Sequence, residues 1–222
     1  VDAAELVHLD DRVLETPSFA VQSAKLEVIR MGNIVKESLD MAQRAILERD
    51  QKLVDTIFER EASIDTLSDA ITAYLVKICS TNINDHENQV VTSLLHVVGD
   101  IERVGDHCEN LGELVNLMID EDTVFSDVAV KELKEILNDS ISSYESAIKA
   151  IEKSDLTYAY DTVKKEDNVD DLEKELRLRH IHRLANNQCV AAAGVVFLDT
   201  LTNLERISDH ALNIAEVVIN EK

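Results

Sequence analysis

The chain of 222 residues carries 44 Asp and Glu against 22 Lys and Arg, which gives a formal net charge of −22. Charge of this sign argues against nucleic acids and anionic membrane surfaces as direct partners, and it is compatible with cations or basic protein surfaces. A hydrophobic content of 45% supports a packed core, and only five Gly and one Pro favour long helices over many short strands.

Hydrophobic periodicity predicts six long helices in chain order. We expect them at about residues 17–47, 50–79, 85–119, 126–151, 155–184 and 187–219. Thr16 and Pro17 suit the N-cap and first position of the first helix, and Asn84 with Glu87 predicts a capping box at the start of the third. A coiled coil is the alternative for such a charge-rich helical sequence, but the regular breaks argue against one long rod.

The six segments form two sets of three, because several stretches of the first half return in the second. Ala45-Ile46 returns as Ala150-Ile151, and the segment 100–113 returns as 203–216. Three antiparallel helices with short loops make a bundle around a shared apolar core. We therefore predict an all-α fold of two tandem, pseudo-symmetric three-helix bundles. The expected organisation is a leader at 1–16, a first bundle at 17–120 and a second at 125–222.

The longer repeat is notable because its exact matches are polar. Glu102, Arg103, Asp106, His107, Asn110 and Glu113 return as Glu205, Arg206, Asp209, His210, Asn213 and Glu216. A repeat kept only for packing would keep its apolar face and let the polar face vary. The pattern therefore indicates a duplicated site.

Each half also carries two acidic pairs at i, i+4 spacing, which places both members of a pair on one helix face. The pairs are Glu61/Asp65 and Glu102/Asp106 in the first half, and Glu166/Asp170 and Glu205/Asp209 in the second. Two pairs on adjacent helices would form a patch of four carboxylates, which attracts protons or hard cations. The simpler alternative is a solvated acidic face without metal.

The helical arithmetic places these carboxylates away from the core. With about 100° per residue, Val104 and Cys108 fall on the side of the helix opposite Glu102. We therefore expect a surface or groove site. His107 and His210 lie towards the edge of the apolar arc and are expected to pack or to orient neighbours rather than to bind metal.

The repeated Glu-Arg-x-x-Asp-His segment and its partner pairs resemble the PhoU family of phosphate-uptake regulators, over about residues 17–220. The resemblance implies two three-helix bundles that bind multinuclear metal clusters, iron in some members, on their surface through Glu/Asp-x-x-x-Asp motifs. The motif positions here are Glu61, Asp65, Glu102 and Asp106 for one cluster, and Glu166, Asp170, Glu205 and Asp209 for the other. The resemblance further implies regulation of phosphate uptake through contact with a membrane transporter or a signalling protein, without catalysis.

Residues 9–17 resemble the junction between the membrane part of sodium/phosphate cotransporter-like proteins and their cytoplasmic PhoU-like tail. Together with Val1 in place of Met, this predicts a C-terminal cytoplasmic domain at the inner face of a membrane, acting on an attached or separate phosphate transporter. No apolar run reaches the length of a membrane span. Three cysteines without a CxxC pair fit a reducing compartment and are expected to be small core residues.

Two alternatives belong to other functional classes. One is a metal-free helical interaction scaffold whose acidic face docks basic partners. The other, ranked last, is a carboxylate-bridged metalloenzyme, for which the sequence offers no acid–base partner beyond His107 and His210. The sequence leaves the identity of the cation open, and also whether the domain forms a homodimer.

Overall fold

The computed structural model of the chain describes residues 5–221, so the first four residues of the expected leader and position 222 of the expected second bundle lie outside it. A 3-10 helix, η1 (Asp11–Glu15), precedes six α-helices. They are α1 (Pro17–Glu48), α2 (Gln51–Cys79), α3 (Asp85–Asp120), α4 (Asp127–Lys153), α5 (Leu156–Ala185) and α6 (Ala191–Asn220). The described residues contain no strand, which confirms the all-α prediction.

The helix boundaries follow from duplicated local signals. Arg49 and Ser154 end α1 and α4 with positive φ angles of 54° and 48°, and the next residues, Asp50 and Asp155, cap α2 and α5 with their side chains. The predicted capping box at the start of α3 is present. One boundary was predicted wrongly. The hydrophobic periodicity predicts that the sixth helix begins at about Asn187, but α6 begins at Ala191. Asn187 has a left-handed φ of 53°, which is incompatible with the α-helix at that residue.

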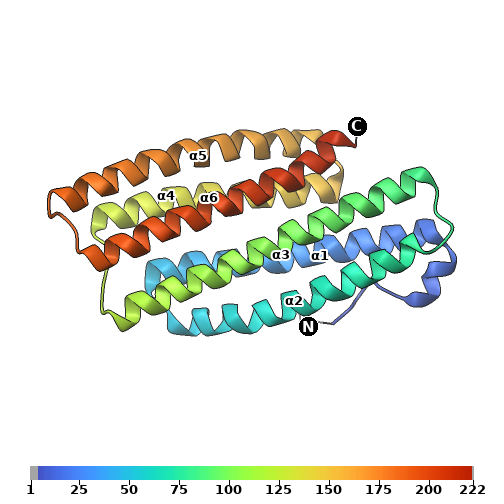
Figure 1. The fold of residues 1–222 in the computed structure, drawn as a ribbon, viewed down its shortest axis with the longest axis horizontal. Helices are drawn as coiled ribbons and strands as arrows, with labels where there is room; N and C mark the ends of the chain where they lie inside the picture. Colours follow the sequence, from blue (N-terminus) through green and yellow to red (C-terminus); the bar gives the residue numbers. More distant parts are fainter. Residues whose placement is uncertain (1–4, 222) are drawn as a thin grey trace.

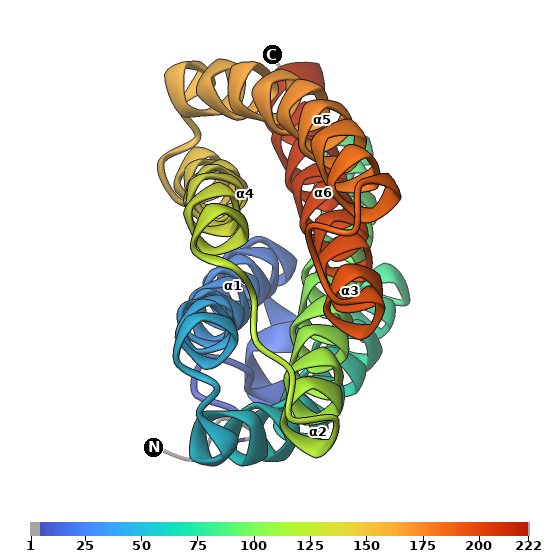
Figure 2. The ribbon, with the colours of Figure 1, turned by 90° about the vertical axis from the view of Figure 1, so that its left-hand side faces the viewer.

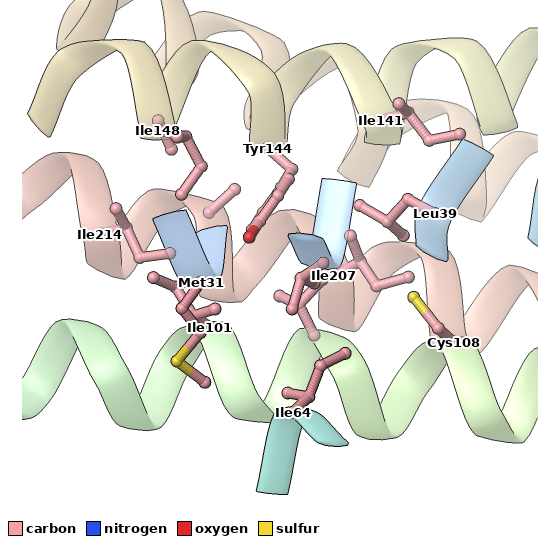
Figure 3. Packing of buried hydrophobic residues seen from close by; sticks show 14 of the residues in the cluster. Met31, Leu39, Ile64, Ile101, Cys108, Ile141, Tyr144, Ile148, Ile207 and Ile214 are labelled. Carbon is pink, nitrogen blue, oxygen red and sulfur yellow. The ribbon is translucent and has the colours of Figure 1, made fainter. Parts of the chain in front are cut away.

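Each set of three helices runs up, down and up, and the two resulting bundles lie side by side (Figure 1). Between the bundles, α3 packs against α6 and α1 against α4. The core is continuous across this interface: Met31 of α1, Tyr144 of α4 and Ile207 of α6 belong to one buried cluster (Figure 3). The hydroxyl of Tyr144 donates to the carbonyl of Gly32 at 2.9 Å and so joins α4 to α1 inside the core.

The leader is fixed to the first bundle by a buried carboxylate. Glu27 of α1 is fully buried and accepts the backbone N–H of His8 at 2.8 Å, while Arg30 donates to the same carboxylate. On the other side, the hydroxyl of Tyr74 donates to the carbonyl of Asp10 at 3.1 Å. These contacts hold the described leader residues against α1 and α2.

The cysteines only partly meet expectation. Cys108 is buried in the core, but Cys79, the last residue of α2, is exposed, and Cys189 is half-buried. None of the three is in a disulfide. Within residues 5–221, no helix is both long and apolar enough to cross a membrane.

Candidate metal centres

The structure brings three carboxylates together in each bundle. Glu61 and Asp65 of α2 meet Asp106 of α3, and one oxygen from each lies within 4.8 Å of the others. The corresponding residues Glu166, Asp170 and Asp209 form the same arrangement between α5 and α6. We call these groups, together with Glu102 for the first and Glu205 for the second, the first and second carboxylate patches.

The two remaining predicted ligands lie at the edge of the patches. Glu102 and Glu205 are not within the tight groups of three, but their charges contribute to the raised pKa values of Glu61 and Glu166. Both side chains are half-buried, one turn before the aspartate of the same patch. The predicted sets of four therefore form two patches, each with three clustered members and one peripheral member.

The expectation that all the carboxylates lie outside the apolar core was wrong for Glu61. This residue is only 5% exposed, although Asp65 and Asp106 are exposed as predicted. The reason is Gly105 on the facing helix: a Cβ atom there would lie 2.8 Å from Oε2 of Glu61. Because glycine has no side chain, the carboxylate of Glu61 can be buried against α3. The angular positions of residues around α3 alone do not predict this burial.

In each patch, burial and the charges of neighbouring carboxylates raise the pKa of one glutamate from the first helix and one aspartate from the second, Glu61 and Asp106 or Glu166 and Asp209. Desolvation, followed by the charges of Asp65 and Asp106, raises the pKa of Glu61 to about 8. Desolvation and the charge of Asp170 raise the pKa of Glu166 to about 7. Near neutral pH each patch therefore holds a proton or requires another positive charge.

The donor atoms fit a hard cation. Glu61 Oε1 and Asp170 Oδ1 are buried, and neither has a hydrogen-bond partner within the described part of the chain. An ionised oxygen without a partner in such a position costs free energy that a bound cation can offset. Clustered carboxylate oxygens suit hard divalent or trivalent cations rather than soft ones.

The two patches differ in charge. In the first, Asp69 and Glu109 add further negative charge, and no Lys or Arg of the described residues forms an ion pair with Asp65 or Asp106. In the second, Lys174 lies 3.6 Å from Asp170 and Arg206 lies 3.5 Å from Asp209. The second patch also has further acidic neighbours, Asp167 and Glu173, so the patches differ mainly in whether their aspartates form ion pairs with basic side chains.

Asp69 and Glu109 were missed by the sequence analysis, although a signal was present. Asp69 continues the i, i+4 series of Glu61 and Asp65, and Glu109 lies seven residues after Glu102. Both spacings return to the same helix face. The second half has Lys174 and Leu212 at the corresponding positions. A comparison that selects acidic residues present in both halves therefore leaves out Asp69 and Glu109.

The repeated histidines join the two halves across the α3–α6 interface. His107 Nδ1 lies 2.8 Å from Asn203 Oδ1, and Asn110 donates to the same oxygen at 3.3 Å. Because this amide oxygen only accepts, Nδ1 of His107 carries the proton. The first half thus contacts the second through Asn203, which lies on α6 two residues before Glu205 and six before Asp209.

The reciprocal contact has the same geometry. His210 Nδ1 lies 2.9 Å from Asp100 Oδ1, and Asn213 donates to that oxygen at 3.1 Å. The rings of His107 and His210 meet with centroids 5.6 Å apart. Each histidine thus hydrogen-bonds through Nδ1 to a side chain of the opposite bundle, an arrangement that fits the expected packing or orienting role.

The substitution Asn203→Ala is expected to lower the free energy of unfolding by about 1–2 kcal/mol, because it leaves the His107 N–H and the Asn110 amide without their acceptor. Urea denaturation measures this difference. Asn33→Ala, at an exposed position of α1, is the control and should change stability by less than about 0.5 kcal/mol. Equal effects of the two substitutions would contradict a stabilising role for the contact.

The model of the PhoU domain matches residues 28–115 and 133–218, which fall within the first and second sets of three helices. The chain belongs to the PhoU family. This confirms the family resemblance found in the repeated segment, and most of both helical sets is covered by the match.

Curated relatives fall into two groups. The chain is 28% identical over 197 residues to "Phosphate-specific transport system accessory protein PhoU homolog 1" of Thermotoga maritima, covering 88% of the chain and 84% of that protein. It is 21% identical over 219 residues to "Putative inorganic phosphate export protein YjbB" of Salmonella typhimurium. That match covers 96% of the chain but only 40% of the longer protein.

Solved PhoU structures share the fold. The crystal structure of PhoU from Pseudomonas aeruginosa superposes with a TM-score of 0.87 at 21% identity and covers 92% of this chain and 97% of that one. PhoU from Streptococcus pneumoniae gives 0.84 at 19% identity, with 93% and 96% covered. These likenesses confirm the two tandem three-helix bundles.

Proposed function

We propose that this PhoU-family domain regulates phosphate transport and binds metal cations at its two carboxylate patches. The observation that carries the metal assignment is the buried, unpartnered Oε1 of Glu61 beside Asp65 and Asp106. The names of the relatives, accessory proteins of phosphate-specific transport and a putative phosphate exporter, support the link to transport. The domain contacts a transporter that is either separate, or attached in a longer chain of the YjbB kind.

The residues that would hold the cations are Glu61, Asp65, Glu102 and Asp106 in the first patch, and Glu166, Asp170, Glu205 and Asp209 in the second. A bound cation, iron or another hard ion, supplies the positive charge that these carboxylates lack. Each patch joins two helices, α2 with α3 or α5 with α6. A cation bound by carboxylates of both helices fixes α2 against α3 in the first bundle and α5 against α6 in the second. The fixed helices define the surface that the domain presents to a transporter.

Purified without chelator, the protein should contain metal by elemental analysis and should melt at a higher temperature with metal than without it. The double substitution Glu102→Gln with Asp106→Asn should remove the metal of the first patch and its share of the stabilisation. Unchanged metal content and melting temperature would refute the site assignment. Wild-type protein that neither contains nor responds to metal would support the metal-free scaffold instead.

A further inference from the structure

A small cavity of about 200 Å³ lies at the end of the molecule where the connection between α3 and α4 and the connection between α5 and α6 come together (Figure 2). Its lining is mostly apolar and comes from both connections and from the first turns of α4 and α6. Two side chains with reactive groups, His180 and Cys189, also line it. None of the eight carboxylates assigned to the patches does.

His180 reaches the cavity from α5 and is held in place by its neighbours. The residue is only 2% exposed, and its ring stacks on Phe197 of α6 with centroids 4.4 Å apart. Gly194 of α6 leaves room for the edge of the ring, because a Cβ atom there would lie 2.9 Å from Nε2 of His180. At the other edge, Arg183 donates to Nδ1 at 3.3 Å. The imidazole therefore has a defined orientation.

The contact with Arg183 decides which nitrogen of His180 carries the proton. Burial, and then the charge of Arg183, lowers the pKa of His180, so the ring is neutral near pH 7 and has one N–H. A guanidinium group only donates, so Nδ1 accepts and Nε2 carries the proton. Nε2 lies 4.0 Å from the sulfur of Cys189, and no oxygen or nitrogen atom of the described residues is hydrogen-bonded to it. A buried N–H donor is thus directed at the thiol.

Cys189 differs from the other two cysteines in its surroundings. Cys108 is buried in the core, and Cys79 is exposed at the end of α2. Cys189 is half-buried and directly precedes Val190, the N-cap of α6, which makes no side-chain capping hydrogen bond. The first turn of a helix carries partial positive charge. A positive helix end and an N–H donor both favour the thiolate, which is the nucleophilic form of cysteine.

We propose that Cys189 is a peroxide-sensitive thiol and that the cavity admits the small hydroperoxide that oxidises it. The thiolate sulfur attacks the terminal oxygen of the hydroperoxide, the O–O bond breaks, and the S–O bond of a sulfenic acid forms. The sulfur loses two electrons to the peroxide. The departing oxygen takes up the proton that the thiol released and leaves as water or as an alcohol. His180 acts as a positioning residue, because its Nε2–H stabilises the thiolate.

The size of the cavity limits the oxidant. A water molecule takes up about 30 Å³ in the liquid, so a cavity of about 200 Å³ has room for hydrogen peroxide or a short alkyl hydroperoxide. A disulfide as large as oxidised glutathione does not fit. The reaction uses none of the metal-binding carboxylates, so it is independent of the proposed metal sites.

The test treats the whole protein with hydrogen peroxide in the presence of chelator and of dimedone, which traps sulfenic acids. Mass spectrometry of the digested protein then measures the labelling rate of each cysteine. We expect Cys189 to be labelled roughly 10-fold faster than Cys79, although Cys79 is the more exposed of the two. Cys108 should stay unlabelled because it is buried. Exposure alone predicts the opposite order for Cys79 and Cys189.

A substitution at His180 tests the role of its N–H. His180→Leu removes this donor but keeps an apolar side chain against Phe197, and it should slow the labelling of Cys189 to the rate of Cys79 or below. His182→Leu is the matched control, because His182 is exposed on the same helix, contacts Asn186, and should leave the rate unchanged. If His180→Leu shows no cooperative melting transition, Gly194→Ala replaces it. Its new Cβ displaces the imidazole and should slow the labelling in the same way.

Three results would overturn the proposal. The first is labelling of Cys79 at the same rate as Cys189 or faster. The second is an unchanged rate for Cys189 in a folded protein with His180→Leu or Gly194→Ala. The third is an equal preference for Cys189 over Cys79 when oxidised glutathione replaces hydrogen peroxide, because that reagent is too large for the cavity.

Discussion

Glu61→Gln is expected to stabilise the metal-free protein at pH 8 and to abolish the metal response of the first patch. The pKa of Glu61 is about 8 in the fold, against about 4.3 in an unfolded chain. As the pH rises between these values, the unfolded state loses this proton first, so the folded state loses stability. The uncharged amide avoids this loss, and its expected gain is about 1 kcal/mol at pH 5 and several-fold larger at pH 8.

The measurement is urea denaturation of both proteins with chelator at pH 5 and pH 8. Burial lowers the pKa of His107 and His180, which affects the pH dependence in the opposite direction, but both proteins share these groups and the difference between them isolates Glu61. Glu59→Gln, at an exposed position of α2, makes the same charge change and should have little effect. A Glu61→Gln protein that is less stable than wild type at pH 8 would show that the carboxylate is satisfied without metal.

Gly105→Ala is expected to remove metal from the first patch without unfolding the domain. The new Cβ would lie 2.8 Å from Glu61 Oε2, the end of a flexible side chain, so the carboxylate moves and the backbone does not. Metal affinity of the first patch should fall roughly 10–100-fold, which is the usual effect of changing a residue that positions a metal-binding side chain. The second patch has Ser208 at the corresponding position and should keep its metal.

Gly99→Ala provides the matched control on the same helix, because a Cβ at that position meets no atom within 4 Å. A glycine to alanine change inside a helix is otherwise worth up to about 1 kcal/mol of added stability. Gly99→Ala should show this gain by urea denaturation and leave metal content unchanged. If both variants retain metal equally, Gly105 has no role in forming the site.

The sequence by itself determined the helices and their duplication. Apolar residues that recur with helical periodicity can be buried in only one way, and capping residues such as Asn84 fix where a helix begins. The acidic pairs were also readable, because i, i+4 spacing within a helix fixes a shared face regardless of the rest of the fold. These properties are local, and local geometry is encoded within a few residues.

Tertiary structure decided what lies between helices. The burial of Glu61 depends on Gly105 of another helix, and the acceptors of His107 and His210 come from the opposite bundle. Such features depend on which helices face each other and at what register, and spacing within a single helix contains no information about either.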